Sequence, residues 1–210
     1  MARKTKQEAL ETRGQILDAA EHVFREKGVS HTTLTDIAEA AGVTRGAIYW
    51  HFKNKIDLFN QMHERIYLPI QALAEESANR VEPDPLGRLR ELLVTVLKDT
   101  VRNPHQQRVL DILFLRCEFI SQMGALVERQ TRYHQEAMDR TRRALENAIT
   151  RGQLPEALDT RKATTALHAY IRGLITNWLL LPENFNLERD AESLVDAYFD
   201  MLRHSAAFRQ

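Results

Sequence analysis

The 210-residue chain lacks several features that would fix its chemistry. It contains one cysteine, Cys117, so an intrachain disulfide framework is excluded. We interpret that residue as a small buried hydrophobe, with a redox switch as the alternative. No run approaches the ~18 apolar residues that a membrane-spanning helix needs, and no apolar signal region follows the basic start. We therefore expect a cytoplasmic protein with no membrane partner.

Signatures of catalysis and metal binding are also missing. The sequence has no nucleophile elbow, P-loop or dinucleotide fingerprint. None of its eight histidines pairs at H-x-x-x-H spacing, and a single cysteine argues against structural zinc. We expect no enzymatic activity, no cofactor and no metal. Two alternatives stay open: a small all-α enzyme using Cys117 or a histidine, and a helical adaptor that binds only protein.

The charge balance is neutral overall, because 29 basic residues face 29 acidic ones. This balance alone argues against a nucleic-acid partner, but the location of the basic groups matters more. No acidic residue occurs from Ala40 to Ile56, and Arg3, Lys4 and Lys6 open the chain. We expect residues 1–9 to form a basic arm that reaches DNA, or else a solubilising tail.

Apolar residues recur at helical spacing along the whole chain, without strand-like alternation of useful length. Glycine and proline are few, eight and six, and they fall mainly where these stripes end. Pro69 is an exception, since it lies inside a stripe and should kink that helix or loosen its hydrogen bonds. The prediction is an all-α fold of about nine helices.

One short region has the pattern of a DNA-binding motif. Thr33 and Asp36 form a helix-start pair of capping-box type, and Gly42 can adopt the positive φ of a tight turn. A helix of barely two turns then begins at Thr44-Arg45-Gly46. Two helices joined by a glycine turn are typical of the helix-turn-helix, whose second helix enters the major groove.

The stretch G-V-T-R-G-A-I-Y-W-H-F-K-N-K resembles the recognition signature of TetR-family transcriptional repressors. The resemblance extends to the family's multidrug-efflux branch through five further segments: A-R-K-T-K-Q-E-A, D-I-L-F-L-R-C-E-F, G-Q-L-P, W-L-L-L-P and D-M-L-R-H-S-A-A-F-R. It implies an N-terminal three-helix helix-turn-helix domain over residues 1–55. Residues 56–210 would form a helical ligand-binding and dimerisation domain.

The candidate DNA-binding residues lie in and beside the short helix. Arg45 could bond O6 and N7 of guanine together, and Gly46 would let the backbone approach the groove. We expect Tyr49 and His51 to face DNA, whereas Trp50 could equally brace the helix. Helix N-termini attract phosphate, which favours Thr33 and Lys55 as phosphate contacts. The full predicted set is Thr33, Thr35, Thr44, Arg45, Gly46, Tyr49, Trp50, His51 and Lys55.

The resemblance also implies a ligand-responsive homodimer. Such a repressor binds a palindromic operator of double-stranded DNA, represses a multidrug efflux pump operon, and is released by bulky, largely apolar antimicrobials. The fourth helix would carry the signal. Part of the stripes through Ile171, Leu174, Ile175 and through Leu194, Val195, Tyr198, Leu202 would lie in the dimer interface.

The predicted ligand site is a cavity with mostly apolar walls and a few polar groups. His168 and Arg172 are its polar candidates, although His168 could instead be a hydrogen-bonded core histidine. Arg172 replaces an acidic residue found in a member of the efflux branch, which indicates a preference for anionic or phenolic ligands. The predicted lining is Met62, Ile66, Ile70, Leu89, Leu93, Val96, Leu110, Phe114, Met138, His168, Ile171 and Arg172.

Overall fold

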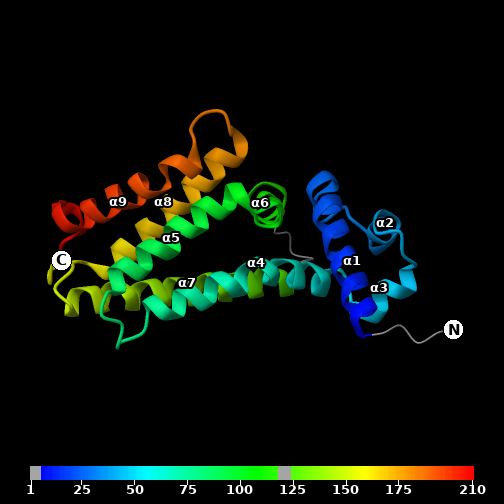
Figure 1. The fold of residues 1–210 in the computed structure, drawn as a ribbon, viewed down its shortest axis with the longest axis horizontal. Coiled ribbons are helices and arrows are strands. Elements are labelled where there is room, and N and C mark those ends of the chain that lie inside the picture. Colours follow the sequence, from blue (N-terminus) through cyan, green and yellow to red (C-terminus); the bar gives the residue numbers. More distant parts are fainter. Residues whose placement is uncertain (1–5, 118–123) are drawn as a thin grey trace. The chain divides into compact units, whose positions relative to one another are not determined.

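The structure is a computed structural model that describes residues 6–117 and 124–210. Over these ranges it contains nine α-helices and no strands, which confirms the all-α prediction (Figure 1). Arg3 and Lys4 of the predicted arm lie outside the described residues. The helices are α1 Lys6–Lys27, α2 Leu34–Ala40, α3 Arg45–His51, α4 Lys55–Ser77, α5 Pro85–Arg102, α6 Pro104–Asp111, α7 Gly124–Thr150, α8 Thr160–Leu180 and α9 Leu187–His204, with a π-helical turn η1 Ile112–Arg116 and a 3-10 turn η3 Ala206–Phe208.

The chain divides into two compact units. The first, here the N-terminal unit, comprises Met1–Tyr67 and Pro104–Glu128; the second, the body unit, comprises Leu68–Asn103 and Arg129–Gln210. Helix α4 contributes to both, and the division falls just before Pro69. The predicted domains 1–55 and 56–210 divide the chain differently, and they stay a prediction. Among the helices described, none is both long and apolar enough to cross a membrane.

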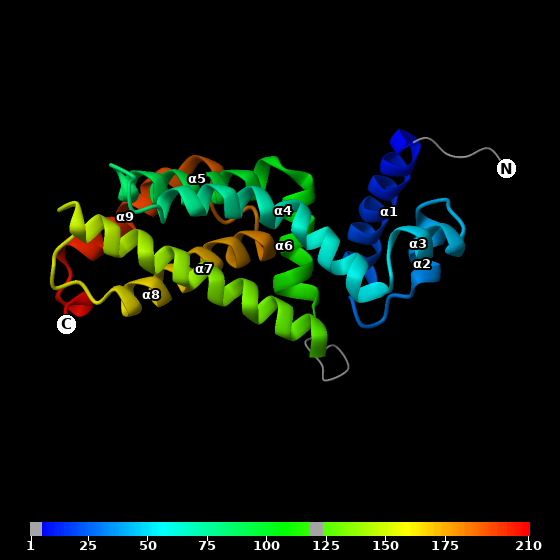
Figure 2. The ribbon, with the colours of Figure 1, turned by 90° about the horizontal axis from the view of Figure 1, so that it is seen from below.

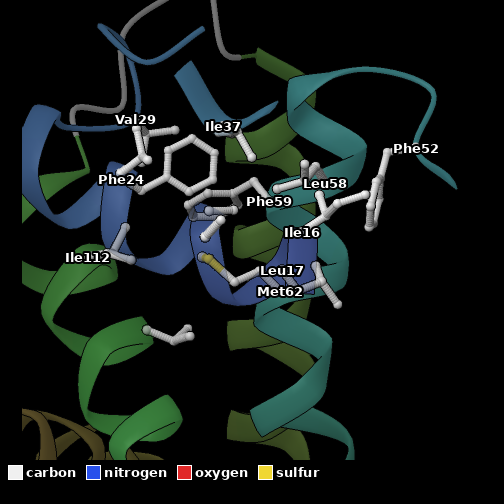
Figure 3. Packing of buried hydrophobic residues seen from close by; sticks show 14 of the residues in the cluster. Ile16, Leu17, Phe24, Val29, Ile37, Phe52, Leu58, Phe59, Met62 and Ile112 are labelled. Carbon is white, nitrogen blue, oxygen red and sulfur yellow. The ribbon is translucent and has the colours of Figure 1, made fainter. Parts of the chain in front are cut away.

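The N-terminal unit has one hydrophobic core, built from helices far apart in the sequence. The rings of Phe24 in α1 and Phe59 in α4 meet edge to face, with centroids 5.8 Å apart. Ile37 of α2 and Ile112 of η1 are fully buried in the same cluster (Figure 3). Cys117 packs against this core and is partly buried, as the small-hydrophobe interpretation expects. Segment 104–117 is therefore part of the same fold as the helix-turn-helix.

A buried carboxylate joins α1 to α6 within this unit. The Glu21 side chain is fully buried, and its carboxylate accepts hydrogen bonds from Arg65 Nη1 at 3.1 Å and from Arg108 Nε at 2.9 Å. His105 Nδ1 lies 2.9 Å from the same carboxylate. Asp18, Glu21 and His105 are close enough to share a cation. Two guanidinium groups already neutralise the carboxylates, however, so we interpret the cluster as an ion-pair network.

Local sequence sets the helix ends around the motif. Gly28 ends α1 with φ of 78°, and Gly42 follows α2 with φ of 63°, a region that favours glycine. The side chain of Asn54 accepts from Asp57 N–H at 2.8 Å and caps α4. The sequence predicted the turn at Gly42, and its positive φ confirms that prediction.

The body unit contains α5, α8 and α9, which lie side by side in both ribbon views (Figures 1 and 2). Arg90 of α5 forms two hydrogen bonds to the Asp196 carboxylate of α9, at 2.6 and 2.8 Å. Tyr198 of α9 donates to the Ala163 carbonyl of α8 at 2.7 Å. Val195, Tyr198 and Leu202 are buried inside this unit, so they serve the protomer core. Only part of that stripe, including half-buried Leu194, remains available for an interface.

A candidate DNA-binding surface on the second helix of the motif

Helices α2 and α3 are joined by a turn that holds them at a fixed angle. Gly42 N–H bonds to the Glu39 carbonyl at 3.1 Å and Val43 N–H to the Ala38 carbonyl at 3.0 Å. The Thr44 side chain then caps α3 by accepting from Ala47 N–H at 3.2 Å. Every residue needed for this turn lies within one local stretch, which explains why the sequence predicted it.

Helix α3 buries one face and exposes the other. Ile48 is fully buried and Phe52, just after the helix, is 1% exposed, so both anchor α3 to the core. The opposite face carries five of the predicted DNA-binding residues in exposed positions: Thr44, Arg45, Gly46, Tyr49 and Trp50. No acidic residue interrupts this face, and such a surface suits contact with a polyanion.

Trp50 and His51 form one aromatic pair at the end of α3. Their rings meet edge to face with centroids 4.5 Å apart. The Trp50 residue is 72% exposed, whereas a bracing role would place its ring in the core. The exposure favours a contact role for Trp50 over the structural one. His51 is half-buried.

Arg45 is held by its neighbour one turn along. Its Nη2 donates to the Tyr49 hydroxyl at 3.1 Å, and its guanidinium carbon lies 5.5 Å from the centre of the Tyr49 ring. The contact restricts the conformations of the Arg45 side chain before DNA binds, which reduces the entropy lost when the guanidinium binds a base. Tyr49 therefore positions Arg45 in addition to any contact of its own.

Gly46 has no structural role that the fold explains. It lies inside α3 without a positive φ, and an added Cβ would come no closer than 3.8 Å to another atom, the Thr44 hydroxyl. Alanine would fit this position and favour the helix by ~1 kcal/mol. The missing side chain thus supports the predicted close approach of the backbone to DNA.

The Thr33 hydroxyl is already engaged inside the protein. Its Oγ1 donates to the Asp36 carboxylate at 2.6 Å and accepts from Asp36 N–H at 3.1 Å, while Thr33 N–H also donates to that carboxylate. Lys27 Nζ lies 2.6 Å from Asp36, and its hydrogen bond is the main cause that holds the pKa of Asp36 well below its usual range. A phosphate at Thr33 would meet this carboxylate. Thr35 lies two residues further along the chain and is exposed.

Lys55 is likewise turned into the protein. Its Nζ donates to the carbonyls of Val29 at 2.8 Å, Ser30 at 3.0 Å and Thr32 at 2.7 Å. Burial lowers the pKa of this ammonium. Sequence reasoning missed these contacts because the acceptors lie more than twenty residues away, in the segment between α1 and α2.

The predicted ligand residues are distributed over both units. Met62 and Ile66 are buried in the core of the N-terminal unit, and Leu110 and Phe114 pack against that core. In the body unit, Leu89 and Ile171 are buried, Arg172 is exposed, and the rest are half-buried: Ile70, Leu93, Val96, Met138 and His168. Two surface grooves of the body unit, of about 530 and 430 Å³, have none of these residues in their walls.

His168 has partners inside the body unit. Its Nε2 lies 3.0 Å from the Thr141 hydroxyl, and the His134 ring meets it edge to face at 5.6 Å. Desolvation, and secondarily the nearby His134, lower the pKa of His168 to about 4. His168 is therefore neutral near pH 7, and the Thr141 contact matches the interpretation as a hydrogen-bonded core histidine.

A short, exposed, acid-free helix behind a glycine turn defines a helix-turn-helix DNA-binding protein. Family comparison agrees over most of the chain. Residues 16–62 match the model described as bacterial regulatory proteins, tetR family, and residues 84–204 match the C-terminal region of MAATS-type transcriptional repressors. The chain belongs to the TetR family of transcriptional regulators. Members of this family are regulators and not enzymes.

The chain is also similar to individual members of the family. It is 45% identical to the HTH-type transcriptional regulator TtgR of Pseudomonas putida over the full length of both chains. The structure is similar to that of NalD, the secondary repressor of the MexAB-OprM multidrug efflux pump in Pseudomonas aeruginosa, with a TM-score of 0.83 and 40% identity, covering 95% of this chain and 100% of that one. A SmeT–triclosan complex gives the same TM-score at 34% identity, covering 94% of each chain. SmeT represses the SmeDEF multidrug efflux pump of Stenotrophomonas maltophilia.

Proposed function

We propose that this protein is a ligand-responsive repressor that binds a palindromic DNA operator as a homodimer and controls a multidrug efflux pump operon in the cytoplasm. The observation that carries the proposal is the exposed face of α3, where Arg45, Tyr49 and Trp50 stand beside Gly46 with no acidic neighbour on the helix. One helix of two turns reads few base pairs, and a two-fold dimer doubles the contacts on a palindrome. The efflux target rests on the named roles of NalD and SmeT.

DNA binding is tested by selection from a pool of random duplexes with the full-length protein. We expect a palindromic site to emerge, whose affinity falls ~10³-fold or more between 50 and 200 mM salt because several phosphates are neutralised. Equal affinity for the selected and scrambled duplexes, or a flat salt response, would reject the proposal.

We further propose that the inducer is bulky and largely apolar, with an anionic or phenolic group. Triclosan, the ligand in the SmeT complex, is a suitable probe. A ligand shifts the DNA-binding equilibrium only through its different affinities for the two conformations. Triclosan should therefore release the selected duplex at concentrations that saturate the protein.

Calorimetry of Phe114→Ala and His168→Ala tests the predicted lining. Both variants should bind triclosan with altered affinity and bind the duplex like the wild type. Unchanged triclosan affinity in both would remove these positions from the site. Saturation with triclosan that leaves duplex affinity unchanged would reject triclosan as an inducer.

A further inference from the structure

All three donors of one ammonium group converge on a single short segment of the helix-turn-helix region. Lys55 Nζ donates to the main-chain carbonyls of Val29, Ser30 and Thr32 at 2.7 to 3.0 Å. A lysine ammonium has three donors and no acceptor. The three carbonyls therefore use its entire donor capacity, and a phosphate could be bound only by giving one of them up.

The segment that Lys55 holds lies directly before the motif. It runs from the end of α1 to Thr33, the N-cap residue of α2. Val29 is fully buried and Thr32 is 1% exposed, so water cannot easily replace the ammonium at their carbonyls. A buried carbonyl without a partner costs free energy comparable to a lost hydrogen bond. Removing the ammonium should thus displace the segment.

Displacement at the start of α2 would reach the DNA-binding face. The turn after α2 is fixed to it by the bonds from Gly42 and Val43 to the carbonyls of Glu39 and Ala38. Helix α3 follows that turn at once. The two helices therefore move together, and a shift before Thr33 changes where α3 presents Arg45.

We infer that Lys55 is a positioning residue whose ammonium fixes the segment before Thr33, and with it α2 and α3, in place of a contact to DNA phosphate. The inference rests on the proposed DNA-binding function. It differs from the phosphate role expected from the sequence, in which a lysine at a helix N-terminus acts through its charge alone.

The substitutions Lys55→Arg and Lys55→Met separate the two roles. Arginine keeps the charge and binds phosphate well, but its donors lie in one plane and cannot converge from a single nitrogen on three carbonyls. A phosphate role predicts that Lys55→Arg binds like the wild type. A positioning role predicts that both variants lose about tenfold or more in affinity for the selected duplex, and less for a scrambled one.

The measurement is fluorescence anisotropy on both duplexes, with the active fraction taken from stoichiometric titration. That correction removes losses caused only by partial unfolding, which would leave the ratio of the two affinities unchanged. Lys53→Met is the matched control, because Lys53 is exposed two residues earlier in the same acid-free stretch. Its affinity ratio should stay within about twofold of the wild type.

Wild-type affinity of Lys55→Arg, or equal losses on the two duplexes, would overturn the inference. Failure of the wild type to select any duplex would instead reject the proposed function. The wild-type protein gives an independent test by ¹⁵N NMR of its lysine ammonium groups. The Lys55 signal should keep its chemical shift when the duplex is added, and a scalar coupling to ³¹P in the complex would overturn the inference.

Discussion

Arg108 and Glu21, 87 positions apart in sequence, form a buried ion pair in which Arg108 Nε donates to Glu21 Oε2 at 2.9 Å. The pair joins α6 to α1, and the carboxylate is fully buried. Removing one partner from a buried pair leaves a charge in a medium that solvates it poorly. The stability of the N-terminal unit should therefore depend on a residue that lies far outside the helix-turn-helix sequence.

Arg108→Met should lower the free energy of unfolding by about 2 to 3 kcal/mol. The loss should be smaller than the ~3–5 kcal/mol typical of a broken buried pair, because Arg65 and His105 still contact Glu21. Urea denaturation measures it. The control is Arg203→Met, which breaks the exposed pair with Asp200 and should cost under ~1 kcal/mol. Equal losses of unfolding free energy in the two variants would contradict the expectation that breaking a buried ion pair costs more than breaking an exposed one.

Gly46→Ala should make the free protein more stable and DNA binding weaker. Alanine favours a helix over glycine by ~1 kcal/mol, and at this position it meets no atom closer than 3.8 Å. A methyl group on the DNA-facing side would hold the backbone away from the groove. Thermal unfolding and duplex affinity are measured together. Gly14→Ala in α1, where an added Cβ would meet no atom within 4 Å, should stabilise the protein without weakening DNA binding. If both variants weaken DNA binding equally, the close approach of the Gly46 backbone to the groove is wrong.

Arg45→Ala should relax sequence preference. A guanidinium bonded to guanine O6 and N7 contributes ~1–3 kcal/mol of discrimination per half-site. Competition between the selected duplex and single-base variants should show this loss at one base pair of each half-site. Tyr49→Phe should have a smaller effect at the same base pair, since it removes only the hydroxyl that holds Arg45. A loss shared by all sequences would mean that Arg45 binds phosphate instead.

The stability of the body unit should fall as pH decreases from 6.5 toward 4. The pKa of His168 is about 4 in the folded protein, against 6.5 for an ordinary histidine. Between these values the unfolded chain binds more protons, so acidification favours unfolding, and the contribution is fully present above pH 6.5. The difference corresponds to about 3 kcal/mol. In His168→Gln the free energy of unfolding, measured with urea, should change less with pH across this window than in the wild type. Parallel pH profiles for the two proteins would contradict the lowered pKa of His168.

Leu194→Glu should give folded monomers that no longer bind the selected duplex. Leu194, Ala197 and Met201 follow one face of α9 at helical spacing, and all three are at least partly exposed, Met201 by 42%. That face is available for a second copy of the chain. Val195→Glu serves as the contrast, because Val195 is fully buried and its replacement should unfold the protein. Sedimentation showing a wild-type monomer at micromolar concentration would refute the interface.

Devices made by neighbouring residues were predictable from the sequence. The capping box of Thr33 and Asp36 needs only residues three apart, and the turn at Gly42 needs only one residue without a Cβ. Contacts between distant segments were not predictable. Lys55 looked like a phosphate ligand because nothing in its own helix indicates the carbonyls of Val29 and Thr32. Likewise, no residue near Glu21 in the sequence indicates that Arg108, 87 positions later, binds its carboxylate.

The return of α6 and η1 to the core of the N-terminal unit limits how the protein can be re-engineered. Val109 and Ile112 are both fully buried there, beside Phe24 and Phe59 of the helices that frame the motif. A graft that transplants only the first 67 residues onto a foreign sensor would leave an apolar hole and a Glu21 carboxylate that has lost Arg108 and His105. A chimera built for a biosensor circuit must carry segment 104–117 with the motif, and its splice points belong on either side of that segment.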